Sequence, residues 1–105
     1  CHGESINVEF EKDFSINEII SILKNSPGII VEDEPNKNLY PMSSTSVGHD
    51  EVFVGRIRKD FSVKHGINMW VVADNLRKGA ASNAIQIMDE KMLIYRCCHS
   101  SCNTI

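Results

Sequence analysis

Residues Glu51–Arg58 read EVFVGRIR, and within this stretch Phe53, Gly55 and Ile57 recur at every second position. Such an alternation places the three residues on one face of a β-strand, as in a strand with one buried side. After a short connection, Ile67–Ala73 reads INMWVVA and predicts a second, largely buried strand. Two strands on either side of a short connection predict an antiparallel hairpin.

A strand, a helix and another short strand are predicted before this hairpin. Ile6–Phe10 alternates between apolar and polar residues, as a half-buried strand does. Ser15 and Glu18 form a capping box, in which each side chain accepts a hydrogen bond from the backbone amide of the other residue. Pro27-Gly28 ends the helix, and the β-branched segment Gly28–Asp33 predicts the strand. The helix carries one apolar stripe at helical spacing: Ile16, Ile19, Ile20 and Leu23.

The remaining segments predict a long loop and a second helix. Glu34–Asp50 has two prolines, several serines and no clear period, and loops of this length often contact a ligand or a partner. From about Asn75 a helix is predicted, and its first half, Gly79-Ala80-Ala81, leaves room for another backbone or a flat ligand. Its apolar side comprises Ala81, Ala84, Ile85 and Met88. The order of elements predicts an α+β fold, with an antiparallel or mixed sheet covered by helices.

The composition is that of one globular domain. The chain has 105 residues, of which 42% are apolar and 24% charged, and its formal net charge is −3. The densest basic group, Arg56–Lys59, is flanked by acidic residues, so we expect a charged hairpin face and no nucleic-acid partner. No apolar run is long enough to cross a bilayer, and no signal-like segment opens the chain. We therefore expect a cytoplasmic protein without a membrane partner.

Two positions are candidates for a catalytic or ligand-binding role. His2 precedes the first predicted strand and could transfer a proton, oriented by the carboxylate of Glu4; the alternative is a structural or surface histidine. Asn75 lies where a strand gives way to the second helix, where free amides and the helix dipole favour a polar or anionic ligand. The alternative is that Asp74 or Asn75 only caps that helix.

The cysteines leave one further alternative open. Cys97, Cys98 and Cys102 crowd into the last nine residues, whereas a disulfide scaffold would spread its bridges through the fold. With His99 they offer one group of zinc ligands, but zinc sites usually combine two closely spaced pairs. Our interpretation therefore assigns no metal and keeps a small zinc-binding protein as an alternative.

Together these segments resemble the C-terminal region of aspartate-semialdehyde dehydrogenases, from Cys1 to about Met88. The most specific stretches are Asp50–Asp60, DEVFVGRIRKD, and Trp70–Ala81, WVVADNLRKGAA, and the likeness continues through Asn83–Ile87. The resemblance implies an NADP-dependent oxidoreductase that interconverts aspartyl phosphate and aspartate semialdehyde, on the path to lysine, methionine and threonine. Phosphate and aspartate semialdehyde are the implied small-molecule substrates, and a homodimer is the implied full-length form.

The resemblance also assigns roles to two residues. His2 aligns with the family's general acid–base histidine, and Asn75 with a residue that contacts the NADP cofactor. The family's nucleophilic cysteine, which forms a thioacyl intermediate, and its substrate-binding arginine belong to earlier parts of the family's chain. Gly3 departs from the family, which usually has Ser or a similar residue after the histidine.

The resemblance therefore predicts a fragment. The chain begins at Cys1 rather than Met, Cys1 is not in the nucleophile motif, and no Gly-x-Gly-x-x-Gly fingerprint occurs. We interpret residues 1–90 as the C-terminal part of the catalytic and dimerisation domain, ending in the helix that returns to the missing nucleotide-binding half. Residues 91–105 form a divergent Cys-rich tail. We expect no activity from the chain alone, and a stand-alone α+β interaction module is the other alternative.

Overall fold

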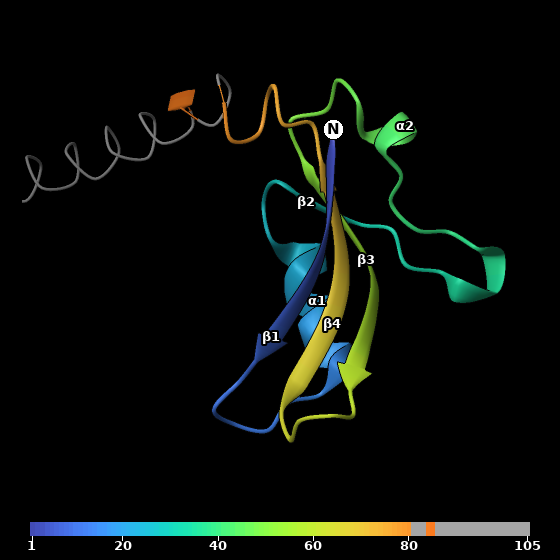
Figure 1. Cartoon of the computed structure of the whole chain (residues 1–105), viewed down its shortest axis with the longest axis vertical. Coiled ribbons are helices and arrows are strands. Elements are labelled where there is room, and N and C mark those ends of the chain that lie inside the picture. The colour runs from blue at the N-terminus through green and yellow to red at the C-terminus, as the bar shows by residue number, and fades with distance from the viewer. Residues whose placement is uncertain (81–83, 86–105) are drawn as a thin grey trace, which may run out of the picture.

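The computed structural model describes residues 1–80 and 84–85 of the chain. A four-stranded sheet forms its centre, and one helix packs beside it (Figure 1). In chain order the elements are strand β1 (His2–Glu9), helix α1 (Ile16–Asn25), strand β2 (Ile29–Val31), the 3-10 helix η1 (Pro35–Lys37), the short helix α2 (Ser43–Ser46), and strands β3 (Val52–Asp60) and β4 (Gly66–Ala73).

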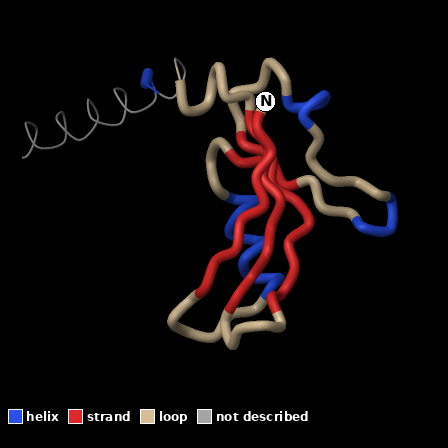
Figure 2. The backbone as a smooth tube through the Cα atoms, in the orientation of Figure 1, coloured by secondary structure: helices blue, strands red, loops and turns tan. Residues whose placement is uncertain are grey.

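The sheet has the strand order β1-β4-β3-β2 and is mixed. β4 pairs antiparallel with both β1 and β3, whereas β2 pairs parallel with β3. The predicted β3–β4 hairpin is therefore confirmed, and so is the α+β fold with a mixed sheet. Figure 2 shows α1 alongside the strands and the segment between β2 and β3 extending away from them.

Helix α1 begins and ends where the sequence predicts, but not by the predicted capping bonds. Ser15 is the N-cap residue and makes no side-chain capping hydrogen bond, so the expectation of a capping box was wrong. The apolar stripe is confirmed, because its residues are half-buried while Ile22, on another face of the helix, is 56% exposed. Burial of this stripe against β2 and β3 therefore orders the helix without the cap.

Strand β3 contains a bulge that the alternation does not reveal. Its register against β4 shifts by one residue between Gly55 and Arg58, and Arg56 adopts a positive φ of 52°. A bulge leaves a backbone amide outside the strand ladder. Here the Ile57 amide donates instead to Asp33 Oδ2 over 3.0 Å, so the carboxylate replaces a strand partner.

The long segment between β2 and β3 contains the two short helices and packs against the sheet at Pro41. Pro41 and Ser46 are fully buried, and the Trp70 indole donates from Nε1 to the Pro41 carbonyl over 3.0 Å. Gly55 leaves room for this packing, because a Cβ there would stand 2.5 Å from Cδ of Pro41. The contact between Pro41 and Trp70 is thus one point at which the segment is attached to the sheet.

Two expectations about local structure were wrong. β1 begins at His2, so His2, Gly3 and Glu4 lie within the strand rather than before it. The second helix does not begin at Asn75, because residues 75–80 form turns. Among the described residues after Ala73, only Ala84 and Ile85 are helical. The Met88 part of that helix and the Cys-rich tail lie outside the described residues.

Candidate functional site

Both predicted site residues, His2 and Asn75, line one shallow hollow at the end of the sheet where β1 begins and β4 ends. The hollow has a volume of about 220 Å³. The strand register explains why His2 and Asn75 lie close together, because His2 pairs with Ala73 and Asn75 follows Ala73 by two residues. The complete lining is His2, Glu4, Val52, Val71, Ala73, Asn75 and Lys78.

The polar groups of the hollow come from one strand and one turn. His2 and Glu4 are two residues apart in β1, so their side chains leave the same face of the sheet. Asn75 is half-buried, and Lys78 belongs to the same turn. An imidazole, a carboxylate, an amide and an ammonium group therefore surround one small space. This set can move a proton, orient an imidazole and bind a polar or anionic ligand.

Sequence reasoning did not single out Lys78. It follows Asn75 by three residues, and in the structure both residues belong to the turns formed by residues 75–80. In the sequence, Lys78 could be noticed only as a positively charged residue close to the predicted ligand-binding position. Glu4, in contrast, was named as a carboxylate near His2, and it lines the same hollow.

The turn that carries Asn75 is organised by Asp74, which is only 7% exposed. Asp74 Oδ2 accepts from the Gly48 amide over 2.9 Å, and Oδ1 accepts from the Leu76 amide over 3.0 Å. The bond from Gly48, followed by that from Leu76, holds the pKa of the Asp74 carboxyl below its usual value. The alternative that Asp74 caps this junction therefore matches the geometry, although it caps a turn rather than a long helix.

A second contact links the same two segments. Arg77 Nε donates to Asp50 Oδ1 over 2.7 Å, and both side chains are 45% exposed. This hydrogen bond raises the pKa of the Arg77 guanidinium. The turn after β4 and the segment before β3 are therefore joined both at Asp74 and at Arg77.

Gly3 lies next to His2 but faces the other side of the sheet. A Cβ at Gly3 would overlap Cζ2 of Trp70, so the indole occupies the space that a side chain would need. Trp70 in turn is fixed by its hydrogen bond to Pro41. The glycine at position 3 is thus explained by packing against Trp70.

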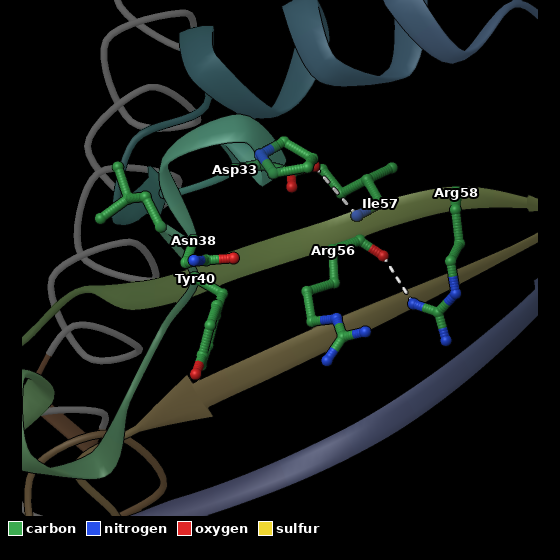
Figure 3. Close-up of a pocket in the computed structure, with 8 residues that line it drawn as sticks. Asp33, Asn38, Tyr40, Arg56, Ile57 and Arg58 are labelled. Carbon is green, nitrogen blue, oxygen red and sulfur yellow. Dashed lines mark hydrogen bonds between the residues drawn. The ribbon is translucent and has the colours of Figure 1, made fainter.

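The two arginines of the GRIR stretch line a different pocket, of about 350 Å³, beside the segment before α2 (Figure 3). Arg58 Nη1 donates to the Arg56 carbonyl over 2.7 Å, and the Arg56 guanidinium carbon lies 6.0 Å from the centre of the Tyr40 ring. Both arginines are exposed, as expected of a charged hairpin face. They do not line the hollow that contains His2.

Some earlier expectations fall beyond the described part of the chain. The zinc alternative depends on Cys97, Cys98, His99 and Cys102, all of which lie outside the described residues. Cys1 is exposed and not in a disulfide. Within residues 1–80 and 84–85, no helix is long and apolar enough to cross a membrane.

Comparison with known proteins identifies the family. The family described as "Semialdehyde dehydrogenase, dimerisation domain" matches residues 1–78. An aspartate-semialdehyde dehydrogenase of Aquifex aeolicus is 58% identical over 88 residues, which are 84% of this chain and 26% of that protein. One of Bacillus subtilis is 46% identical over 89 residues, again 84% of this chain and 26% of that protein. The chain thus spans about a quarter of the length of these relatives.

Solved structures agree with the sequence comparison. Aspartate semialdehyde dehydrogenase II of Vibrio cholerae, complexed with ASA, has a TM-score of 0.76 and 39% identity to this chain. The match covers 83% of this chain and 25% of that one. The matched residues 1–78 contain the whole four-stranded sheet and its helix, and the chain therefore belongs to the semialdehyde dehydrogenase dimerisation-domain family.

Proposed function

We propose that this chain forms part of an NADP-dependent aspartate-semialdehyde dehydrogenase, which interconverts aspartyl phosphate and aspartate semialdehyde. The relatives carry that name, and one of them is 58% identical over most of this chain. The observation that carries the proposal is the meeting of His2 and Asn75 in one hollow. The family resemblance assigns proton transfer and cofactor contact to these two positions, and a dehydrogenase needs both at the same centre.

The hollow suits one end of a dinucleotide rather than the whole molecule. Its volume of about 220 Å³ is below the roughly 300–1,000 Å³ typical of complete ligand pockets. The Asn75 amide can both donate to and accept from a carboxamide, which suits the nicotinamide end. NADPH, when bound, supplies the hydride for reduction. The other parts of the cofactor would then be held by the nucleotide-binding half that the resemblance implies.

The residues of this chain would have separate tasks. His2 would exchange a proton with the reacting groups, and the Glu4 carboxylate would favour one orientation of its imidazole. Lys78 would attract the phosphate or carboxylate groups of anionic substrates toward the hollow. The nucleophile is expected from the nucleotide-binding half, so we expect the chain alone to be inactive.

The proposal extends to assembly and boundaries. The family is one of dimerisation domains, which supports a homodimer of the complete enzyme. We assign residues 1–90 to this domain and residues 91–105 to a separate tail. The proposed location of the enzyme is the cytoplasm, where the pathway to lysine, methionine and threonine would use its product.

Substitution of His2 tests the proposed activity. The assay enzyme is the Aquifex aeolicus relative in which this chain replaces the matching 88 residues. In it, His2→Ala should lower kcat about 100- to 10,000-fold and change KM only a few-fold, since general acid–base help acts in the transition state. Steady-state kinetics with aspartate semialdehyde, phosphate and NADP would measure both constants.

His49 provides the matched control. It is an exposed histidine that lies 3.9 Å from Glu51 and does not line the hollow. His49→Ala should leave kcat within about twofold, because surface substitutions away from a site have small effects. If His2→Ala kept its turnover within a few-fold of the unsubstituted assay enzyme, a catalytic role for His2 would be excluded.

A further inference from the structure

The turn that carries Asn75 belongs to neither the sheet nor a long helix, so its position needs a separate cause. β4 ends at Ala73, and residues 75–80 form turns. A turn that follows the last ladder bond of a strand can adopt many directions unless side chains fix it. The contacts of Asp74 are therefore decisive for where Asn75 lies.

Asp74 fixes the turn at both of its carboxylate oxygens and at its carbonyl. Oδ1 accepts from the Leu76 amide, and the Asp74 carbonyl accepts from the amides of Arg77 and Lys78 over 3.0 and 2.8 Å. These three bonds close the turn around Asn75. Oδ2 accepts from the Gly48 amide, which belongs to the segment before β3. This fourth bond ties the closed turn to a distant part of the chain.

The Gly48 end of this connection is itself fixed. Gly48 has a φ of 82°, a conformation that glycine adopts without strain. It follows the buried Ser46, whose hydroxyl donates to the Met42 carbonyl over 2.9 Å. The Gly48 amide, which donates to Asp74, therefore lies two residues after a buried serine, and a connection to it can hold the turn.

We propose that Asp74 is a positioning residue, which holds Asn75 at the cofactor end of the hollow by joining its turn to Gly48. The inference rests on the proposed function, because it requires Asn75 to contact NADP. Asp74 itself does not line the hollow. Its effect on cofactor binding must therefore pass through Asn75.

The geometry requires a carboxylate rather than an amide. Two backbone N–H groups point at the two oxygens of Asp74, so both terminal atoms must accept. Asparagine has one accepting oxygen, and its NH₂ group would face one of the N–H donors. Asp74→Asn therefore breaks one of the two bonds with almost no change in volume. Asp74→Ser is a milder variant, because its hydroxyl can still accept from the Leu76 amide.

The exposed pair of Arg77 with Asp50 offers a matched control. It joins the same two segments, but both side chains are 45% exposed, and exposed ion pairs contribute little. Asp50→Asn also removes one negative charge, as Asp74→Asn does. If the connection at Asp74 holds the turn, Asp50→Asn should change the Kd for NADP less than about twofold.

The test is a double-mutant cycle in the assay enzyme, with the Kd for NADP measured by calorimetry. Asp74→Asn should weaken NADP binding about tenfold, as expected when a buried polar contact is lost. Asn75→Ala should weaken it by a similar factor. In the Asn75→Ala enzyme, adding Asp74→Asn should change the Kd by less than about twofold, because the contact that Asp74 positions is already gone.

A purely structural role for Asp74 predicts other results. In that case Asp74→Asn would lower the melting temperature and leave the Kd for NADP unchanged, or would raise the Kd equally with and without Asn75. Either result overturns the inference. If Asp74→Asn does not fold, Asp74→Ser replaces it in the same cycle with the same expectations. If Asn75→Ala alone leaves the Kd unchanged, the proposed cofactor contact of Asn75 is wrong. The result for Asn75→Ala therefore separates a failure of that contact from a failure of the positioning role of Asp74.

Discussion

Gly3 illustrates what a single residue can reveal only after folding. In the sequence it is a departure from the family's usual Ser after the histidine, and its consequence for hydrogen bonding could not be deduced. In the structure the indole of Trp70, from the neighbouring strand, occupies the position of the missing side chain. The sequence could not predict this, because the cross-strand neighbour is set by the register and lies far along the chain.

Adding a methyl group at Gly3 tests this packing. Gly3→Ala should lower the free energy of unfolding by about 1–3 kcal/mol, because the Cβ would overlap an indole fixed by its bond to Pro41. Thermal or urea unfolding of the chain measures the change. In the Trp70→Phe variant, which has a smaller ring, Gly3→Ala should lower the free energy of unfolding by clearly less. Equal costs in both backgrounds would show that the indole does not limit position 3.

Elements were predicted best where one face is buried against the rest of the fold. Alternation located β3 and the helical stripe located α1, because periodic burial leaves a periodic sequence, and a short, largely apolar run located β4. The bulge in β3 and the turns at residues 75–80 were missed. In both, a single carboxylate accepts a hydrogen bond from a backbone amide elsewhere in the chain: Asp33 from Ile57, and Asp74 from Gly48. No local period in the sequence records such bonds.

The role of Asp33 in the bulge can be tested by removing its carboxylate. Asp33→Ala would leave the Ile57 amide, part-buried in the bulge, without its acceptor. The free energy of unfolding should fall by about 1–3 kcal/mol, the usual cost of an unsatisfied buried donor. Urea unfolding of the chain measures it.

Glu34 is the control for this variant, since it is the adjacent acidic residue. Its carboxylate pairs with Lys37 at 2.7 Å, and the two side chains are 51% and 76% exposed. Glu34→Ala should change the free energy of unfolding by no more than about 0.5 kcal/mol. If Asp33→Ala cost no more than Glu34→Ala, the bulge would be stable without its carboxylate acceptor.

At the scale of the whole molecule, topology creates the hollow. His2 opens β1 and Asn75 follows β4, so the two are far apart in the sequence and adjacent only because β1 and β4 are antiparallel neighbours. The sequence predicted each residue separately, His2 from its chemistry and Asn75 from its place after a strand. Only the family resemblance linked them, since the order of strands in the sheet cannot be read from the alternation.

The same topology leaves the described part of the molecule with little buried apolar surface. The buried hydrophobic residues are few: Phe53, Val54, Ile57, Ile67 and Val72. Several large apolar side chains are exposed instead, among them Phe61 at 90%, Leu76 at 76% and Val47 at 62%. Exposed apolar side chains of this kind favour contacts with other surfaces, from which such a domain is expected to gain stability.

We therefore expect the chain on its own to self-associate. A family of dimerisation domains is built to bury part of its surface against a second subunit, and Leu76 follows directly after the proposed cofactor residue. Light scattering coupled to sizing should give a mass above that of one chain at micromolar concentration, and a dye for exposed apolar surface should bind. Leu76→Ser should reduce both signals, whereas Ser62→Ala, on an exposed turn, should not. A sharp monomer peak without dye binding would show instead that the isolated chain covers its own apolar surface.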